Sequence, residues 1–376
     1  MGQKNNDVFV LNNNRKCDSI FSLISNERLV NIMNIVVLAG GISTERDVSL
    51  ISGKNIYAAL KEKGQNAILI DVFMGYEGDI NGIFSKDTDW AANIEDIKSE
   101  NPDIRQIMAS RGGDSKSYFG PNVIDICGNA DIVFMALHGE DGENGKVQAA
   151  FDLMGIKYTG TDYVSAALSM DKSISKDMFA RYDIPTPIGI KLENENDMAE
   201  SIQFPKVVKA ANGGSSVGVY ITNNIEEYKK AVKEAFSYDN TVIVEEYVKG
   251  REFSVGVIEG RAIPIIEIIP KTGFYDYKNK YQPGNTEEIC PAELPKENEE
   301  EMKNTAEKVF KALRLKTYAR VDFLMKDTDN SIYCLEANTL PGMTPMSLIP
   351  QEAAAEGINY PDLCMKIIDI SMKKYE

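Results

Sequence analysis

From Ile35 onward, short apolar segments typical of β-strands alternate with longer segments typical of helices. Strands are expected at 35–39, 67–72 and 131–137, and helices near 47–63 and 144–155. A strand, a helix and a second strand in succession build a parallel sheet with helices packed on it. Residues 33–160 are therefore expected to form an open α/β domain.

The second half of the chain mixes its strands and helices in a different order. A helix is expected at 172–182, and the prolines Pro185 and Pro187 behind it indicate a boundary. The remaining expected elements are strands at 207–209, 217–221, 241–246, 253–258, 262–269, 317–325 and 332–337, with helices near 225–236, 297–313 and 360–374. The order of elements in this half thus differs from the alternation of the first half.

Composition excludes several classes of protein. The 376 residues are 43% apolar, enough for two or three domains, and 41 Lys and Arg against 57 Asp and Glu leave a net charge of −16. That charge argues against nucleic acid or an anionic membrane as a partner. Five dispersed cysteines and a single histidine do not indicate a zinc site. No apolar stretch of about 18 residues and no leader pattern is visible, so a cytoplasmic location is expected.

Three segments do not follow the alternation. Residues 1–32 are Asn-rich at first and lack an apolar period, so they are interpreted as an N-terminal appendage. Residues 74–128 are rich in Gly, Asp, Asn and Ser and are expected to be an irregular insertion. Residues 159–171 are expected to be a connector.

Two strand-like segments carry charges at alternate positions. Side chains two apart on a strand point to the same face, so Arg320 with Asp322, and Glu336 with Asn338, form two pairs. If the strands are neighbours, the four polar groups form one cluster. Carboxylate and amide oxygens suit Mg²⁺ bound together with substrate phosphates. The alternative is a surface ion pair, which the interleaved apolar residues Val321 and Ala337 disfavour.

Three loops are further candidates for ligand binding. The glycine-rich loop at 213–218 lies between two strands, where its N–H groups can wrap a phosphate, with Lys209 close by in sequence. The alternative is that residues 213–218 form only an ordinary turn, which has the same glycine and serine pattern. Glu45 opens a helix, where it either binds a substrate ammonium or only favours the helix dipole. His138 begins a polar loop, expected to be mobile, at the carboxyl end of a parallel strand, where ligands bind in open sheets. A purely structural role is the alternative for this single histidine. The polar, aromatic segment 274–281 resembles a lid.

The order of these segments matches a known family. The motifs are AGGISTERDVSL at 39–50, ALHGEDGENGKVQ at 136–148, YTGTDYVSAALSMDK at 158–172, GGSSVG at 213–218, FYDYKNKY at 274–281, RVDF at 320–323 and LEANTLPGMTPMSLIP at 335–350. Through them, residues 33–376 resemble the D-alanine:D-alanine ligases of the ATP-grasp superfamily.

The resemblance implies the fold class α/β plus α+β, with an ATP-grasp fold preceded by an open, Rossmann-like α/β domain. The expected domains are a substrate domain at 33–160, a central ATP-grasp domain at 161–246 and a C-terminal catalytic domain at 247–376. It also implies a cytoplasmic homodimer that makes D-alanyl-D-alanine for peptidoglycan precursors from ATP and D-alanine. Two Mg²⁺ ions, or Mn²⁺ in their place, are the implied cofactors.

The resemblance also assigns residues. Those assigned to ATP are Lys172, Lys209, Ser216, Glu245, Glu246, Val248, Glu252 and Lys280. Those assigned to the metal are Asp322, Glu336 and Asn338. Those assigned to catalysis are Glu45, Ser215, Tyr281, Arg320 and Gly342, with Arg320 and the Gly342 N–H at the oxyanion. Those assigned to substrate are Glu45 for the first ammonium, His138, and Ser347 with Leu348 for the second carboxylate.

Three alternatives compete with this interpretation. A ligase of the same architecture could accept D-lactate or D-serine as second substrate, although Tyr281 and the Ser347-Leu348 pair resemble the D-alanine type. A nucleotide-binding regulator without catalysis would be expected to lose metal ligands or Arg320. An NAD-linked dehydrogenase would need the G-x-G-x-x-G fingerprint, which is absent.

Overall fold

The first sheet of the chain is parallel and has the strand order β2-β1-β3. Its strands are β1 (Asn34–Ala39), β2 (Asn66–Asp71) and β3 (Ile132–Met135). The computed structural model describes residues 32–94, 102–111, 116–214, 218–271 and 284–376. Within it, the expected strands at 35–39, 67–72 and 131–137 are confirmed with shifts of one or two residues at their ends.

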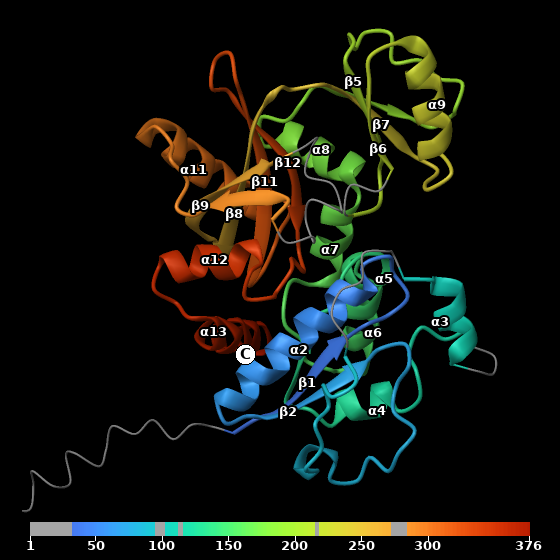
Figure 1. The fold of residues 1–376 in the computed structure, drawn as a ribbon, viewed down its shortest axis with the longest axis vertical. Helices are drawn as coiled ribbons and strands as arrows, with labels where there is room; N and C mark the ends of the chain where they lie inside the picture. Colours follow the sequence, from blue (N-terminus) through green and yellow to red (C-terminus); the bar gives the residue numbers. More distant parts are fainter. Residues whose placement is uncertain (1–31, 95–101, 112–115, 215–217, 272–283) are drawn as a thin grey trace, which may run out of the picture. The chain divides into compact units, whose positions relative to one another are not determined.

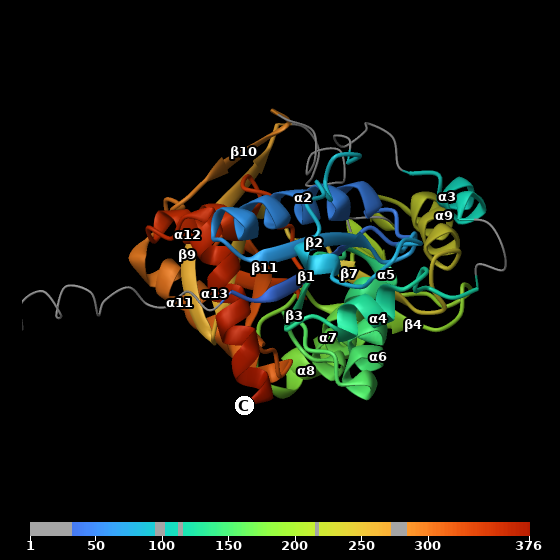
Figure 2. The same ribbon diagram turned by 90° about the horizontal axis from the view of Figure 1, so that it is seen from below.

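Both faces of this sheet are covered by helices (Figures 1 and 2). Val36 and Leu38 of β1 face one group of helices, while Ile35 and Val37 face the other, as the two-residue period of a strand requires. The covering helices are α4 (Val123–Gly128) and α6 (Lys146–Met154) on the first side, and α2 (Arg46–Glu62) and α13 (Tyr360–Met372) on the second. In a parallel sheet covered on both faces, ligands bind at the loops that follow the carboxyl ends of the strands.

Two regions expected to be irregular contain helices. The stretch 74–128 includes α4, whose Val123 and Ile126 are buried against the first sheet, so it is partly an integral layer of the fold. Its other short elements are the 3-10 turn η1 (Ile83–Ser85) and α3 (Ile104–Ser110). The expected connector at 159–171 contains α7 (Tyr163–Met170), which begins because the Asp162 carboxylate accepts the N–H of Ser165.

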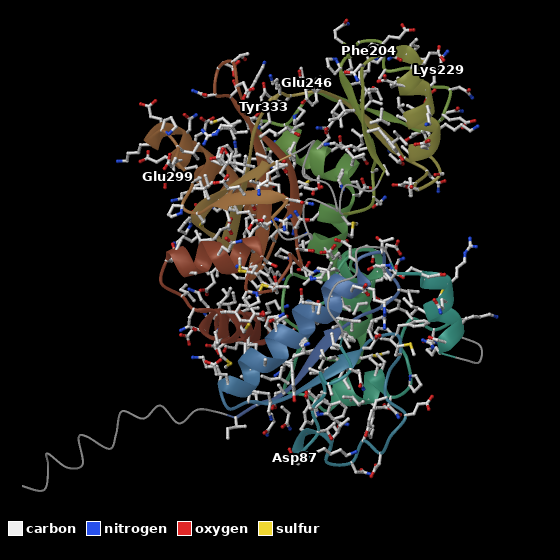
Figure 3. All side chains as sticks on the ribbon, in the orientation of Figure 1. Asp87, Phe204, Lys229, Glu246, Glu299 and Tyr333 are labelled. Carbon is white, nitrogen blue, oxygen red and sulfur yellow. The ribbon has the colours of Figure 1, made fainter. Side chains whose placement is uncertain are left out.

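The second sheet is antiparallel and has the order β4-β7-β5-β6. Its strands are β4 (Gly189–Leu192), β5 (Lys206–Ala210), β6 (Val219–Thr222) and β7 (Val242–Glu246). Helix α9 (Ile225–Ala235) packs on it through Tyr228 and Val232, whereas its Lys229 is exposed (Figure 3). Helix α8 (Lys172–Arg181) precedes this sheet, and its first backbone N–H donates to Ala211 O just after β5 at 3.0 Å.

The third sheet is antiparallel, with the order β10-β9-β8-β11-β12. Its strands are β8 (Gly250–Ile258), β9 (Arg261–Pro270), β10 (Thr286–Ile289), β11 (Tyr318–Lys326) and β12 (Ile332–Asn338). One face packs against α11 (Lys296–Ala312) through Val255 and Val321, and the other lies toward α12 (Leu348–Ala355). The chain ends with the 3-10 turn η2 (Lys373–Tyr375).

Met33–Glu376 forms one compact unit. None of the helices in the described part of the chain has the length and apolar character needed to span a membrane. Ser215, Ser216, Lys280 and Tyr281, most of the 1–32 appendage and the whole expected lid at 274–281 lie outside the described residues.

Candidate active site

The two charged strand segments are adjacent in the structure, which meets the condition for a single polar cluster. Strands β11 and β12 pair antiparallel, with Arg320 opposite Asn338 and Asp322 opposite Glu336. The alternate residues Val321 and Phe323 are fully buried beneath α11. The strand period therefore directs all four polar side chains away from that core, toward one face of the sheet.

Asp322 is the centre of a hydrogen-bonded cluster on this face. Arg320 donates to it from Nε at 2.9 Å and from Nη2 at 2.8 Å. Asn338 Nδ2 donates to Oδ2 at 2.9 Å, and Ser254 Oγ, from β8, donates to Oδ1 at 3.0 Å. Because Asp322 is buried, these four bonds replace the water that its carboxylate loses on folding.

Lys172 brings a positive charge to the same cluster from the start of α8. Its Nζ lies 3.3 Å from Glu336 Oε2 and donates to Gly213 O, in the glycine-rich loop, at 2.7 Å. The helix begins here because the Asp171 carboxylate accepts the N–H groups of Ser173 and Ile174. An N-terminal cap thus places Lys172 between the loop and the metal candidates.

Glu245 of β7 is bound by two lysines, one of which sequence analysis missed. Lys209 Nζ lies 2.5 Å from Glu245 Oε2, and Lys176 Nζ lies 2.7 Å from Oε1. Burial alone would raise the pKa of Glu245, but the two ammonium groups outweigh burial and lower it. Lys176 follows Lys172 by one helical turn, a spacing that could have indicated a shared face.

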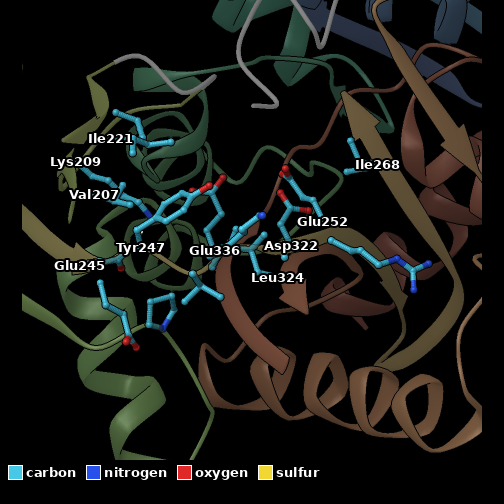
Figure 4. A pocket seen from close by; sticks show the side chains of 18 of the residues that line it. Val207, Lys209, Ile221, Glu245, Tyr247, Glu252, Ile268, Asp322, Leu324 and Glu336 are labelled. Carbon is cyan, nitrogen blue, oxygen red and sulfur yellow. Dashed lines mark ion pairs between the residues drawn. The ribbon is translucent and has the colours of Figure 1, made fainter. Parts of the chain in front are cut away.

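A cavity of about 490 Å³ lies between the second and third sheets, within the size range of small-molecule sites. Figure 4 shows Val207, Lys209 and Ile221 on one side of it and Glu252, Asp322 and Leu324 on the other. The predicted residues that line it are Lys172, Lys209, Glu245, Glu246, Val248, Glu252, Asp322 and Glu336. Most of the described residues assigned to ATP and metal are thereby brought together.

Glu45 lies beside the glycine-rich loop. A Cβ atom at Gly214 would lie 3.0 Å from Glu45 Oε2, and one at Gly139 would lie 2.9 Å from the same oxygen. Glu45 is the N-cap residue of α2, yet its side chain makes no capping hydrogen bond. The carboxylate is thus directed toward two backbone loops rather than toward the end of its own helix.

His138 is buried, and both of its ring nitrogens have protein partners. Nδ1 lies 2.9 Å from Leu340 O, and Nε2 lies 3.1 Å from Ser52 Oγ. Burial lowers the pKa of this imidazole. The residues after it, expected to be a mobile loop, form the short helix α5 (Glu140–Glu143). His138 therefore links α2 to the segment that carries Gly342.

The segment after β12 brings Gly342 close to Ser347. A Cβ atom at Gly342 would lie 3.0 Å from Ser347 Oγ, and that oxygen accepts the Thr344 N–H at 3.0 Å. Leu348 begins α12 and is buried. These three predicted residues lie together, although they do not line the large cavity.

Two further carboxyl groups near the site were missed by sequence analysis. Glu143 lines a small recess together with Lys172, Glu336 and Asn338, and burial, followed by the charge of Glu45, raises its pKa. Glu352 of α12 is fully buried, and neither carboxyl oxygen has a hydrogen-bond partner of ordinary geometry. Burial raises the pKa of Glu352 to about 8. No local pattern marks either residue, because both effects arise from packing.

The oxygen atoms of the strand cluster fit a hard divalent cation. Asp322 and Glu336 offer carboxylates, and Asn338 offers an amide oxygen while its nitrogen donates to Asp322. Among the described residues, no three His, Cys, Asp or Glu side chains gather as a metal site by themselves. Such a donor set suits Mg²⁺ that keeps further ligands from water and phosphate.

Comparison with known proteins agrees with this geometry. A family model described as the D-ala D-ala ligase N-terminus matches residues 34–161, and one described as the D-ala D-ala ligase C-terminus matches residues 182–369. The D-alanine–D-alanine ligase of Lacticaseibacillus casei is 44% identical over 91% of this chain and 97% of its own length. That of Pediococcus pentosaceus is 44% identical over 92% of this chain and 99% of its own.

Solved structures give the same result. The D-alanine–D-alanine ligase of Bacillus anthracis complexed with ATP aligns with a TM-score of 0.70 and 31% identity, covering 91% of this chain and 98% of that one. The Coxiella burnetii ligase aligns with a TM-score of 0.71 and 25% identity, covering 91% of this chain and 94% of that one. With family models and relatives matched along nearly its whole length, the chain belongs to the D-alanine–D-alanine ligase family and has its ATP-grasp fold.

Proposed function

We propose that the protein is an ATP-dependent ligase that joins two D-alanine molecules into D-alanyl-D-alanine for peptidoglycan precursors. The observation that carries this proposal is the meeting of Arg320 and Asp322 with Asn338 and Glu336 beside a cavity that Lys172 also lines. Cations and metal-ligating oxygens gathered at one cavity suit the transfer of a phosphoryl group. The family relationship supports the choice of substrates.

In this reaction the carboxylate of the first D-alanine attacks the γ-phosphorus of ATP, and ADP leaves. The amine of the second D-alanine then attacks the carbonyl carbon of the acyl phosphate and loses a proton, and inorganic phosphate leaves. One ATP and two D-alanine molecules thus give one dipeptide, ADP and phosphate. Both steps develop negative charge on oxygen, which cations and N–H groups can stabilise.

Lys172 and Lys209 would bind the ATP phosphates, and Glu245, Glu246, Val248 and Glu252 would hold the adenine and ribose. All six line the cavity. Asp322, Glu336 and Asn338 would hold two Mg²⁺ ions, with Mn²⁺ as a substitute. When bound, these ions would neutralise the transferring phosphoryl group.

Further residues are assigned to the two D-alanine substrates and to the oxyanion. Glu45 would bind the ammonium group of the first D-alanine, and its carboxylate already lies next to the Gly214 backbone. Arg320 and the Gly342 N–H would stabilise the tetrahedral oxyanion, and Ser347 with the Leu348 backbone would bind the second carboxylate. His138 is assigned to substrate binding, although its ring nitrogens already contact Leu340 and Ser52. Ser215, Ser216, Lys280 and Tyr281 stay predictions from the resemblance.

We also propose three domains that follow the three sheets. The Rossmann-like substrate domain at 33–160 would contain β1 to β3, the central domain at 161–246 would contain β4 to β7, and the catalytic domain at 247–376 would contain β8 to β12. Residues 1–32 stay an expected appendage, and a cytoplasmic homodimer without nucleic-acid or membrane partners stays a prediction. Light scattering of the purified protein would measure the oligomeric state.

The direct test supplies purified protein with ATP, Mg²⁺ and D-alanine and identifies the products by mass. D-alanyl-D-alanine, ADP and phosphate are expected in equal amounts, without AMP. Parallel reactions add D-serine or D-lactate, and the dipeptide is expected to predominate when D-alanine is present. Phosphate release that is indifferent to D-amino acids would contradict the proposal. If the main product joined D-alanine to D-serine or D-lactate, the second substrate would be that compound rather than D-alanine.

A further inference from the structure

Lys176 is a largely buried lysine to which the proposed reaction gives no role. Its side chain is 15% exposed, and its Nζ donates to Thr186 Oγ1 at 2.9 Å, Pro187 O at 2.7 Å and Glu245 Oε1 at 2.7 Å. An ammonium group has three N–H donors, so the protein itself satisfies all of them. Lys176 is therefore held in place and has no donor left for a ligand.

The two lysines bound to Glu245 lie in different surroundings. Lys209 lines the cavity and contacts Glu245 Oε2, whereas Lys176 is not among the residues that line the cavity and contacts Glu245 Oε1. A nucleotide phosphate that attracts Lys209 would draw it away from Glu245 Oε2. Lys176 would then be the remaining cation on this buried carboxylate, and it would keep the carboxylate ionised and oriented.

The backbone next to this pair leaves little room for other side chains. Gly189 of β4 lies opposite Glu245 of β7 in the sheet. A Cβ atom at Gly189 would lie 3.1 Å from Glu245 Cγ and 3.1 Å from Lys176 Cε. The Lys176–Glu245 pair thus packs tightly against a glycine, and Oε2 is the oxygen that contacts the cavity-lining Lys209.

We propose that Lys176 is a positioning residue that holds Glu245 as an oriented hydrogen-bond acceptor and thereby makes the nucleotide site select purines with an amino group at position 6. The proposal rests on the assignment of Glu245 to adenine in the proposed function. An ionised carboxylate accepts a hydrogen bond from the 6-amino group of ATP, whereas it repels the 6-oxo oxygen of inosine triphosphate. Lys176 acts through Glu245 and does not touch the nucleotide.

The test measures equilibrium binding of ATP and inosine triphosphate by calorimetry, without D-alanine. The wild type is expected to prefer ATP. Lys176→Met is expected to weaken ATP binding by about tenfold, the order expected for a hydrogen bond to a charged acceptor, and to reduce the preference. Inosine triphosphate binding should not weaken, because Lys176→Met removes no favourable contact with its 6-oxo oxygen. Lys176→Arg, which keeps the charge, should restore much of the preference.

Lys191→Met is the matched control, because Lys191 lies on β4 and forms an exposed pair with Glu193. It should leave both affinities unchanged. If Lys176→Met lowers both affinities equally, or if the wild type binds both nucleotides alike, the proposal is wrong. Lys176→Gln, which keeps an amide donor near Pro187, replaces the Met variant if melting shows that the latter is unfolded. A protein that prefers ATP but makes no dipeptide would contradict the proposed function and leave this inference standing.

Discussion

The charged pair of strands, β11 and β12, and the buried link around His138 hold their polar groups in different ways. In the strand pair, Asp322 accepts bonds from Arg320, Asn338 and Ser254, all within one sheet. In the buried link, His138 joins Leu340 O to the Ser52 hydroxyl of α2, residues that are 202 and 86 positions away in sequence.

The strand pair therefore supplies the charged groups of the site, and the buried link at His138 supplies a fixed contact between distant segments. The strand cluster concentrates ionic groups beside the cavity, where they can exchange partners with a cation or phosphate. The His138 link is buried, and burial favours its neutral imidazole, so it holds backbone segments together. Changes in the cluster should therefore affect chemistry, and changes in the link should affect the placement of the Gly342 segment.

The largest effect is expected from Asp322→Asn in the strand cluster. The substitution removes one negative charge while an amide can retain part of the hydrogen bonding, so the fold should persist. Turnover should fall on the order of 1,000-fold, because metal-assisted charge stabilisation contributes several kcal/mol. Phosphate release with D-alanine measures the effect.

Asp329→Asn is the control for this change, because Asp329 lies in the exposed turn between β11 and β12 and pairs with Lys326. It should keep nearly full activity. An Asp322→Asn protein with near wild-type turnover would remove the strand cluster from the proposed mechanism.

A smaller effect, on stability, is expected from Glu352→Gln. Burial raises the pKa of Glu352 from 4.5 to about 8, so the folded state binds the proton more tightly than the unfolded state. The contribution of Glu352 to the free energy of unfolding is then most favourable below about pH 4.5, falls as pH rises toward about 8, and is constant above that. The slope is about 1.4 kcal/mol per pH unit for one proton. Glu352→Gln should remove this slope, as urea unfolding at pH 6, 7 and 8 would measure.

Glu356→Gln provides the comparison at the end of the same helix. Glu356 pairs with Arg261, whose hydrogen bond lowers its pKa, so its contribution is lost only as pH falls below the usual range of a carboxyl group. The change in the free energy of unfolding caused by Glu356→Gln should therefore be constant from pH 6 to 8. Equal pH slopes in the wild type and Glu352→Gln would show that Glu352 is ionised in the folded protein at these pH values.

The smallest effect is expected from Ser52→Ala in the buried link. Ser52 Oγ contacts His138 Nε2 at 3.1 Å and accepts the Met343 N–H at 3.4 Å. Its removal should lower kcat by up to about tenfold, the order of one lost hydrogen bond, because the Gly342 segment loses one attachment. KM for ATP should not change. Steady-state kinetics with both substrates provides the measurement.

Ser371→Ala is a suitable control, because Ser371 is also fully buried and donates within α13 to Ile367 O. It should leave kcat nearly unchanged. If Ser52→Ala instead raises KM for D-alanine at constant kcat, the His138 link acts in substrate binding rather than in placing the Gly342 segment.

Sequence alone identified the strand cluster because the signal for it is local. The two-residue spacing of Arg320 with Asp322, and of Glu336 with Asn338, predicts a shared face without any knowledge of the fold. The order of the motifs then indicated the family. Even the missed helix α7 had a local signal, since Asp162 is a good N-cap residue three positions before Ser165.

Tertiary structure decided which partners these residues have. The Lys176–Glu245 pair joins α8 to β7, and the His138–Leu340 contact joins segments 202 positions apart. The burial that shifts the pKa of Glu352 depends on α12 packing against β8. Periodicity and capping are properties of neighbouring residues, whereas burial and ion pairing depend on which distant segments the core brings together. Sequence therefore indicated the strands of the site and the family, whereas the helices α4, α5 and α7 and the partners of the polar groups were decided only by the packed fold.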